Sequence, residues 1–143
     1  MVNEYKDGCF FTPLHTAVRE GCVECVKVLL RAGADVARPC ASYPGSPMEC
    51  AVLEGGRRRR VYPILLSAGA TVPPDANDAP WKSNVAAWVD SDAYLRKVRA
   101  VGFPAYEKAH RQTLVTWAAK CFPRLPIEVA AQVVAFAFHV GYY

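Results

Sequence analysis

Apolar residues in the first part of the chain recur three and four positions apart, which is the spacing of one helix face. Two such sets each end before a glycine: Leu14, Ala17 and Val18 before Gly21, and Val26, Leu29 and Leu30 before Gly33. Thr12 offers an N-cap hydroxyl to the first set, and Pro13 suits the first helical turn. The pattern predicts two short helices, and neither is long enough to be stable without a neighbour.

A second unit repeats this order with changes. Its corresponding residues are Ser46, Pro47, Met48, Ala51, Val52 and Gly55, followed by Leu65, Leu66, Gly69 and Val72. Ser46 and Pro47 keep the residue types of an N-cap and a first turn. The unit is longer than the first between its two helices, and the added length coincides with a glycine–arginine segment.

The stretch from Thr12 to Val36 resembles an ankyrin repeat. It reads T-P-L-H-x-A-x-x-x-G, then V-x-x-L-L, then G-A-D-V, in the order and with the gaps of that family. The resemblance implies an all-α fold, a short ankyrin-repeat helical solenoid that presents a surface to other proteins. It also implies that His15 hydrogen-bonds backbone within and between repeats. Glu49 stands at that position in the second unit, which calls the usual bond there into question.

The arginine run Arg57–Arg60 follows Gly55 and Gly56. We interpret it as a solvated loop at the outer edge of the stack. The alternative is a contact for an acidic partner, phosphate or RNA, but the run lacks the interleaved aromatic residues on which bases stack. Pro63 is compatible with a second helix that begins near Arg60, because proline is tolerated in a first turn.

The signature residues of the repeat stop after Val72. The rest predicts helices over four stretches: from Trp81 to Val89, from Ser91 and Asp92 to Gly102, from Pro104 to Cys121, and from Pro126 to Phe138. We divide the chain into two ankyrin repeats at 1–72, the second degenerate, a linker at 73–80, and a divergent repeat with a helical C-terminal cap at 81–143. This last part resembles the tails of algal and protist ankyrin-repeat proteins, in segments such as Tyr94–Arg99 and Tyr106–Arg111.

The final predicted helix is apolar on nearly all sides: Ile127, Val129, Val133, Val134, Phe136 and Phe138. We expect it to be buried within the domain. The alternative is an accessory structural subunit of a larger assembly, which contacts its partners through the C-terminal helices. Leu125-Pro126-Ile127-Glu128 also resembles the opening of an F-box, so a ubiquitin-ligase substrate adaptor is a further alternative. The later helical segments that an F-box needs do not follow it. Ankyrin proteins also often end in a SOCS box, which recruits a ubiquitin-ligase scaffold, but its double Leu-Pro pattern is absent.

The composition favours a folded domain, since 52% of residues are hydrophobic and 21% are charged. A net charge of +4 permits an acidic partner without requiring nucleic acid. We expect no signal peptide and no membrane span, and hence an intracellular protein of the cytoplasm or nucleus. The six cysteines are expected to be free and buryable. Cys22 and Cys25 form a lone C-x-x-C with no second ligand pair, so we predict neither a metal nor a redox site.

The leading hypothesis is a non-enzymatic protein–protein interaction module, an adaptor or scaffold. We predict no catalytic residue and no cofactor, because the chain lacks a phosphate loop and a nucleophile with a base at motif spacing. The partner would be another protein. The positions that vary among ankyrin repeats map the predicted partner-binding residues onto Phe11, Thr16, Arg19, Glu20, Arg38, Tyr43, Leu53 and Glu54, with Gly45 and Cys50 beside them.

Overall fold

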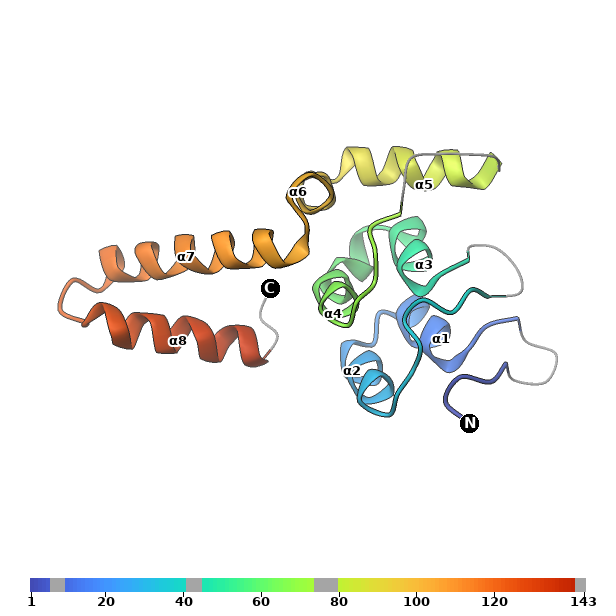
Figure 1. The fold of residues 1–143 in the computed structure, drawn as a ribbon, viewed down its shortest axis with the longest axis horizontal. Coiled ribbons are helices and arrows are strands. Elements are labelled where there is room, and N and C mark those ends of the chain that lie inside the picture. Colours follow the sequence, from blue (N-terminus) through green and yellow to red (C-terminus); the bar gives the residue numbers. More distant parts are fainter. Residues whose placement is uncertain (6–9, 41–44, 74–79, 141–143) are drawn as a thin grey trace. The chain divides into compact units, whose positions relative to one another are not determined.

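The computed structural model describes residues 1–5, 10–40, 45–73 and 80–140 (Figure 1). All regular elements in these residues are helices: α1 Pro13–Glu20, α2 Val23–Arg31, α3 Pro47–Glu54, the 3-10 helix η1 Gly56–Val61, α4 Tyr62–Ser67, α5 Pro80–Ser91, α6 Ala93–Val101, α7 Phe103–Cys121 and α8 Ile127–Val140. The predicted all-α fold is confirmed for these residues. Contacts divide the chain into two compact units, Met1–Arg99 and Ala100–Tyr143, which are described separately.

The first helical pair has the caps that its sequence predicts. The Thr12 hydroxyl accepts a hydrogen bond from the His15 amide, and Pro13 occupies the first turn of α1. Gly21 follows with φ of 67°, in the left-handed region, and its amide donates to the carbonyls of Ala17 and Val18. Because each helix is short, its stability comes from packing of the apolar face on neighbouring helices.

His15 joins the first repeat to the second. Its side chain is fully buried, with Nε2 2.9 Å from the Gly45 carbonyl oxygen and Nδ1 2.8 Å from the Thr12 hydroxyl. A carbonyl oxygen only accepts, so Nε2 carries the proton and Nδ1 accepts from the hydroxyl of Thr12. The implied histidine bonds within and between repeats are therefore present.

Glu49 takes a different role at the equivalent position. Its carboxylate accepts from the Ser46 amide at 2.7 Å, while the Ser46 hydroxyl accepts from the Glu49 amide at 3.2 Å. This reciprocal pair is a capping box, which satisfies two amides at the start of α3. The carboxylate thus stabilises its own helix rather than the junction between helices.

The arginine run is helical and not a loop. Residues Gly56–Val61 form η1, and α4 begins directly after it with Pro63 in its first turn. Proline lacks an amide hydrogen, which a first turn does not need. The expected position of Pro63 is confirmed. The interpretation of Arg57–Arg60 as a loop is wrong, and the side chain of Arg58 is half-buried rather than solvated.

Beyond the repeats, α5 packs against α3. Val85 and Val89 are the buried side of α5, and Leu95 and Val98 that of α6. Asp92 is the N-cap of α6, because its carboxylate accepts from the amides of Tyr94 and Leu95. The middle of the predicted linker, residues 74–79, lies outside the described residues.

In the second unit, α7 and α8 are joined by a short turn and pack on each other (Figure 1). Ala130 and Val134 of α8 are buried, but Val133 is 58% and Phe136 is 70% exposed. The expectation that the final helix is buried within the domain is therefore wrong for one of its faces. The side chain of Phe138 lies outside the part that is described.

Two of the cysteines are paired. Cys22, the N-cap of α2, forms a disulfide with Cys25 in the first turn. The expectation of free cysteines is wrong for this pair. Cys40 and Cys50 are buried, as expected, while Cys121 is exposed.

We expect His15 to make the free energy of unfolding depend on pH. Burial lowers the pKa of His15 below its ordinary value of 6.5, against a smaller opposing effect of the Gly45 bond. Below about pH 6.5 the unfolded chain binds a proton at His15 more tightly than the folded chain does. The stabilisation that is present above this pH is therefore lost as the pH falls. Urea unfolding from about pH 8 to about pH 5 should show this loss in the wild type.

The matched variant for this measurement is His15→Gln, which does not titrate. The free energy of unfolding of this variant is expected to change much less over the same range of pH. Identical pH slopes in the variant and the wild type would contradict the assignment.

Candidate protein-interaction surface

The predicted partner-binding residues lie on α1, on α3 and in the segments before them. On α1, Thr16, Arg19 and Glu20 are exposed, whereas Phe11 just before the helix is half-buried. On α3, Glu54 is exposed and Leu53 is half-buried. Since α1 packs directly on α3, these residues belong to neighbouring helices of one unit.

Three of them form one cluster around Arg19. The Arg19 guanidinium carbon lies 4.8 Å from the centroid of the Phe11 ring, within the range of a cation–π contact. Arg19 Nε also lies 3.9 Å from Glu54 Oε1. Arg19 therefore contacts both Phe11, just before α1, and Glu54, at the end of α3.

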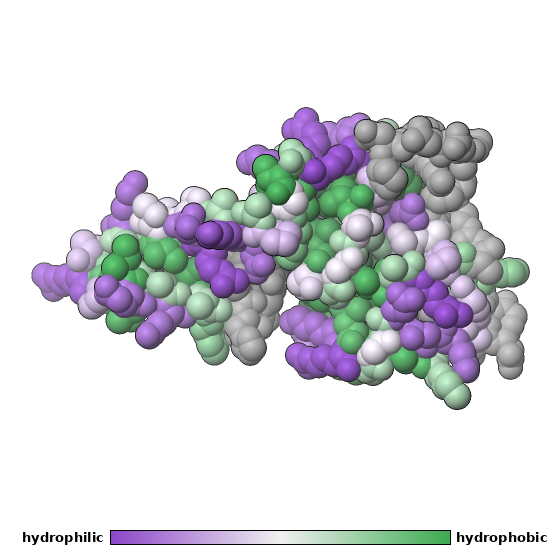
Figure 2. Space-filling view, viewed as in Figure 1, coloured by the Kyte–Doolittle hydropathy of each residue, from purple (hydrophilic) through white to green (hydrophobic). Residues whose placement is uncertain are grey.

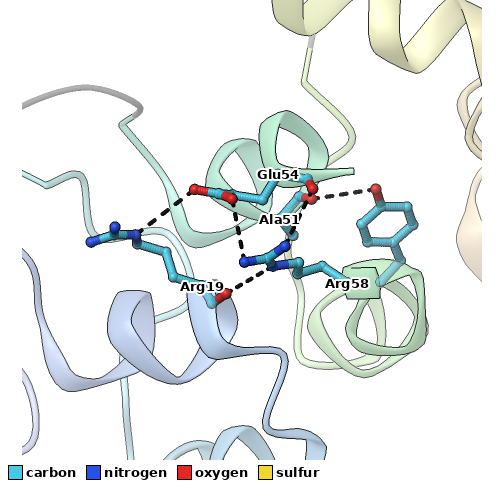
Figure 3. Close-up of polar contacts among 5 residues, drawn as sticks. Arg19, Ala51, Glu54 and Arg58 are labelled. Carbon is cyan, nitrogen blue, oxygen red and sulfur yellow. Dashed lines mark hydrogen bonds and ion pairs between the residues drawn. The ribbon is translucent and has the colours of Figure 1, made fainter. Parts of the chain in front are cut away.

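Arg58 contacts Arg19 and Glu54 of the same cluster (Figure 3). Its Nε donates to the Arg19 carbonyl at 2.8 Å, and its Nη1 donates to the Glu54 carbonyl at 3.4 Å. Its Nη2 also pairs with the Glu54 carboxylate at 3.3 Å. These carbonyls lie in the last turns of α1 and α3, where helical carbonyls lack partners and the dipole favours a cation. One guanidinium thus ties together the C-terminal ends of both helices.

Arg58 was missed as a structural residue because the arginine run suggests a solvated segment. The available signal was the spacing of Glu54 and Arg58, four residues apart, which would pair them if the chain stayed helical. Arg59 also has a partner, since its Nη2 lies 2.9 Å from the Asp92 carboxylate. Arg60 is exposed, as the solvated interpretation predicts, and the side chain of Arg57 lies outside the description.

Arg38 is separate from this cluster. Its guanidinium carbon lies 5.1 Å from the centroid of the Tyr5 ring, and the Tyr5 hydroxyl donates to the Pro39 carbonyl at 2.6 Å. Arg38 is half-buried, so it is part of the N-terminal packing rather than a free contact. Tyr43, predicted on the same segment, lies outside the described residues.

A small cleft opens beside the second repeat. It has a volume of about 230 Å³ and is lined by Val52, Gly55, Arg59, Tyr62, Trp88, Ser91 and Asp92. The Arg59–Asp92 ion pair lies in its wall, and Trp88 is 52% exposed. Arg59 and Trp88 were not among the predicted binding residues.

Two buried titratable side chains lie close to the predicted binding residues of α3. Burial raises the pKa of the Cys50 thiol to about 12, and burial raises the pKa of the Tyr62 hydroxyl to about 12 as well. A thiol with that pKa stays protonated at neutral pH and is a poor nucleophile. The described part of the chain holds no group of three or more His, Cys, Asp or Glu residues that could bind a metal ion.

Within the ranges that the structure describes, no helix combines the length and the apolar character that crossing a bilayer requires.

Comparisons with known proteins point to one repeat family. The ankyrin-repeat family model matches residues 10–40. The chain is 40% identical over 73 residues to BRCA1-associated RING domain protein 1 of Caenorhabditis elegans, a match that covers 50% of this chain and 10% of that protein. The chain therefore matches only a small part of this curated relative. No solved structure matches the chain. Residues 10–40 are an ankyrin repeat, a module of protein–protein interaction.

We expect Arg58→Ala to lower the free energy of unfolding by about 1–3 kcal/mol, the range for losing charge-assisted hydrogen bonds. The variant leaves the Arg19 and Glu54 carbonyls without their guanidinium donor. Urea denaturation at neutral pH measures the change.

Arg60→Ala is the matched control, because it removes the same charge from the same 3-10 helix at an exposed position. Its effect should stay within about 0.5 kcal/mol. Equal losses for the two variants would show that Arg58 acts only through its charge.

Proposed function

We propose that the Met1–Arg99 unit is a protein-binding module that uses the exposed residues of α1 and α3. The observation that carries the proposal is the Phe11–Arg19–Glu54 cluster, which crosses from one repeat to the next and is fixed from behind by Arg58. A surface held in one conformation before binding loses little side-chain entropy when a partner arrives.

The residue types agree with such a role. Arginine and aromatic residues are enriched where proteins bind one another, and Arg19 and Phe11 are joined in one contact. Thr16 and Glu20 are exposed on the same helix. The name of the C. elegans relative records association with another protein, which supports a binding role for a chain that shares part of its sequence.

The structure changes how this surface should be tested. Arg19 and Glu54 contact each other and Arg58, so substituting them would alter both stability and binding. Thr16 and Glu20 are better probes, because their exposed side chains allow substitution with little effect on packing.

A photo-crosslinking amino acid placed at Thr16 or Glu20 should capture a protein in the cells that make this chain. The same group at Glu24 or Arg31, which are exposed on α2, is the control and should not capture that protein. Mass spectrometry identifies the captured protein, and Glu20→Lys should then weaken its binding about tenfold in calorimetry.

The control for the binding measurement is Glu24→Lys, which makes the same charge change on the other helix of the repeat. Equal capture from α1 and α2, or equal loss of binding for the two lysine variants, would count against this surface.

A further inference from the structure

The α7–α8 hairpin carries an exposed apolar surface of its own. More than half of the large apolar side chains that are exposed in the described residues lie between Trp117 and Phe136: Trp117, Phe122, Leu125, Ile127, Val129, Val133 and Phe136. No residue of α7 is buried, although the helix is 19 residues long. Figure 2 shows hydrophobic surface over this hairpin, with hydrophilic residues at the end where the two helices join.

The exposed apolar residues of α8 form one stripe. Val129, Val133 and Phe136 are spaced four and three positions apart, which places them on a single side of the helix. Val129 and Val133 each stand one position before a buried residue on the side that faces α7, Ala130 and Val134, and Phe136 stands one position before the half-buried Ala137. The helix therefore has two adjacent apolar stripes, of which only one is covered by α7.

The same offset holds on α7. Leu114 and Ala118 are less exposed than Thr113 and Trp117, which stand one position before them. The two helices of a hairpin run antiparallel. Because the exposed residues stand one position before the covered residues on both helices, the two exposed stripes lie on the same face of the pair. Trp117 and the α8 stripe therefore share one face of the hairpin.

A shallow groove lies on the exposed side of α7 and reaches the shared face at Trp117, and all of its described lining residues belong to α7. It has a volume of about 540 Å³ and is lined by Ala109, Gln112, Thr113, Thr116, Trp117 and Lys120. These residues follow one another at three- and four-residue spacing, so the groove follows the helix for about three turns. Lys120 is the one charged residue in this lining, next to the indole ring of Trp117 along the helix.

The charges of the hairpin determine which occupant fits. Arg111 pairs with Glu107 at 3.0 Å, which neutralises both. Near this face, Lys120 and Arg124 are exposed and are in no ion pair among the described residues, against a single exposed carboxylate of the hairpin at Glu128. An apolar face with a basic surround repels a second copy of itself and attracts an acidic partner.

We propose that this face binds an amphipathic helix of a partner protein, with acidic residues on both sides of its apolar stripe. The partner's apolar residues pack between Trp117 and the Val129–Val133–Phe136 stripe, and its carboxylates pair with Lys120 and Arg124. An amphipathic helix laid into an apolar groove is a common mode of peptide recognition. This site is separate from the surface on α1 and α3, and it does not depend on the proposed function of that surface.

The full chain can be tested with a fluorescent synthetic peptide. The probe is an amphipathic helix with leucines at three- and four-residue spacing and glutamates beside them, and its match has lysines in place of the glutamates. Fluorescence anisotropy should give the glutamate peptide about tenfold tighter binding, a preference that shrinks as salt is added.

Two sets of variants locate the site. Lys120→Glu with Arg124→Glu should reverse the preference between the peptides, whereas Arg96→Glu with Lys97→Glu, an equal charge change at exposed positions of α6, should leave it unchanged. Val133→Asp with Phe136→Asp should abolish binding of both peptides. Far-UV circular dichroism checks that each variant keeps its helices.

Several results would overturn the proposal. These are equal binding of the two peptides, no effect of the Lys120 and Arg124 charge reversal, and no binding of either peptide to the full chain. Self-association of the chain that Phe136→Asp removes would assign the face to a second copy. Binding to anionic lipid vesicles that excludes the glutamate peptide would assign it to a membrane surface.

Discussion

The carbonyl of Gly45 is the point on which the stacking of the two repeats depends. It accepts from His15 Nε2 at 2.9 Å and from the Cys40 amide at 2.7 Å, so both of its lone pairs are used. Gly45 has φ of 96°, a conformation that glycine adopts readily. Because His15 belongs to α1 and Ser46 begins α3, this carbonyl sets the start of one helix against the start of the next. Two helices of eight residues each would not persist without such a junction.

The opposite ends of the same two helices are joined by Arg58. His15 acts near the N-terminal end of α1, and Arg58 donates to carbonyls in the last turns of α1 and α3. The second unit has Glu49 in place of a histidine, and this residue accepts from the amide of Ser46 in its own capping box. The junction of α1 with α3 thus has a histidine bond at one end and an arginine bond at the other. The pairing of α1 with α3 is therefore fixed at both ends by buried or half-buried polar groups.

The sequence was most informative where a residue type has one local role. Thr12, Pro13 and Gly21 mark the ends of α1, and Asp92 marks the start of α6, because caps act within three residues of their own position. His15 could be assigned through the repeat motif, which carries its long-range bond with it. Such residues are predictable because their partners are close in the chain or are implied by the motif.

Long-range side-chain contacts were not predictable in this way. Arg58 reaches the Arg19 carbonyl 39 positions away, and nothing in the spacing of the arginines reveals that carbonyl. The predicted binding residues Arg19 and Glu54 proved to be partners of each other, since motif positions identify exposure but not pairing. The Cys22–Cys25 disulfide was also not predicted, although its two residues are close in the sequence. Its spacing allowed a bond, and only the helical geometry of α2 brings the two sulfurs together.

The two units use their apolar residues in different ways. In the repeats, Leu14, Val26 and Leu65 are fully buried, and the polar groups between the helices have partners within the chain. In the hairpin, the contact between α7 and α8 buries Ala130 and Val134 but leaves Trp117 and Phe136 exposed. Two helices bury too little apolar surface to offset the conformational entropy lost on folding. A partner helix that covered this face would add to the buried apolar surface, and would thereby link its binding to the folding of this unit.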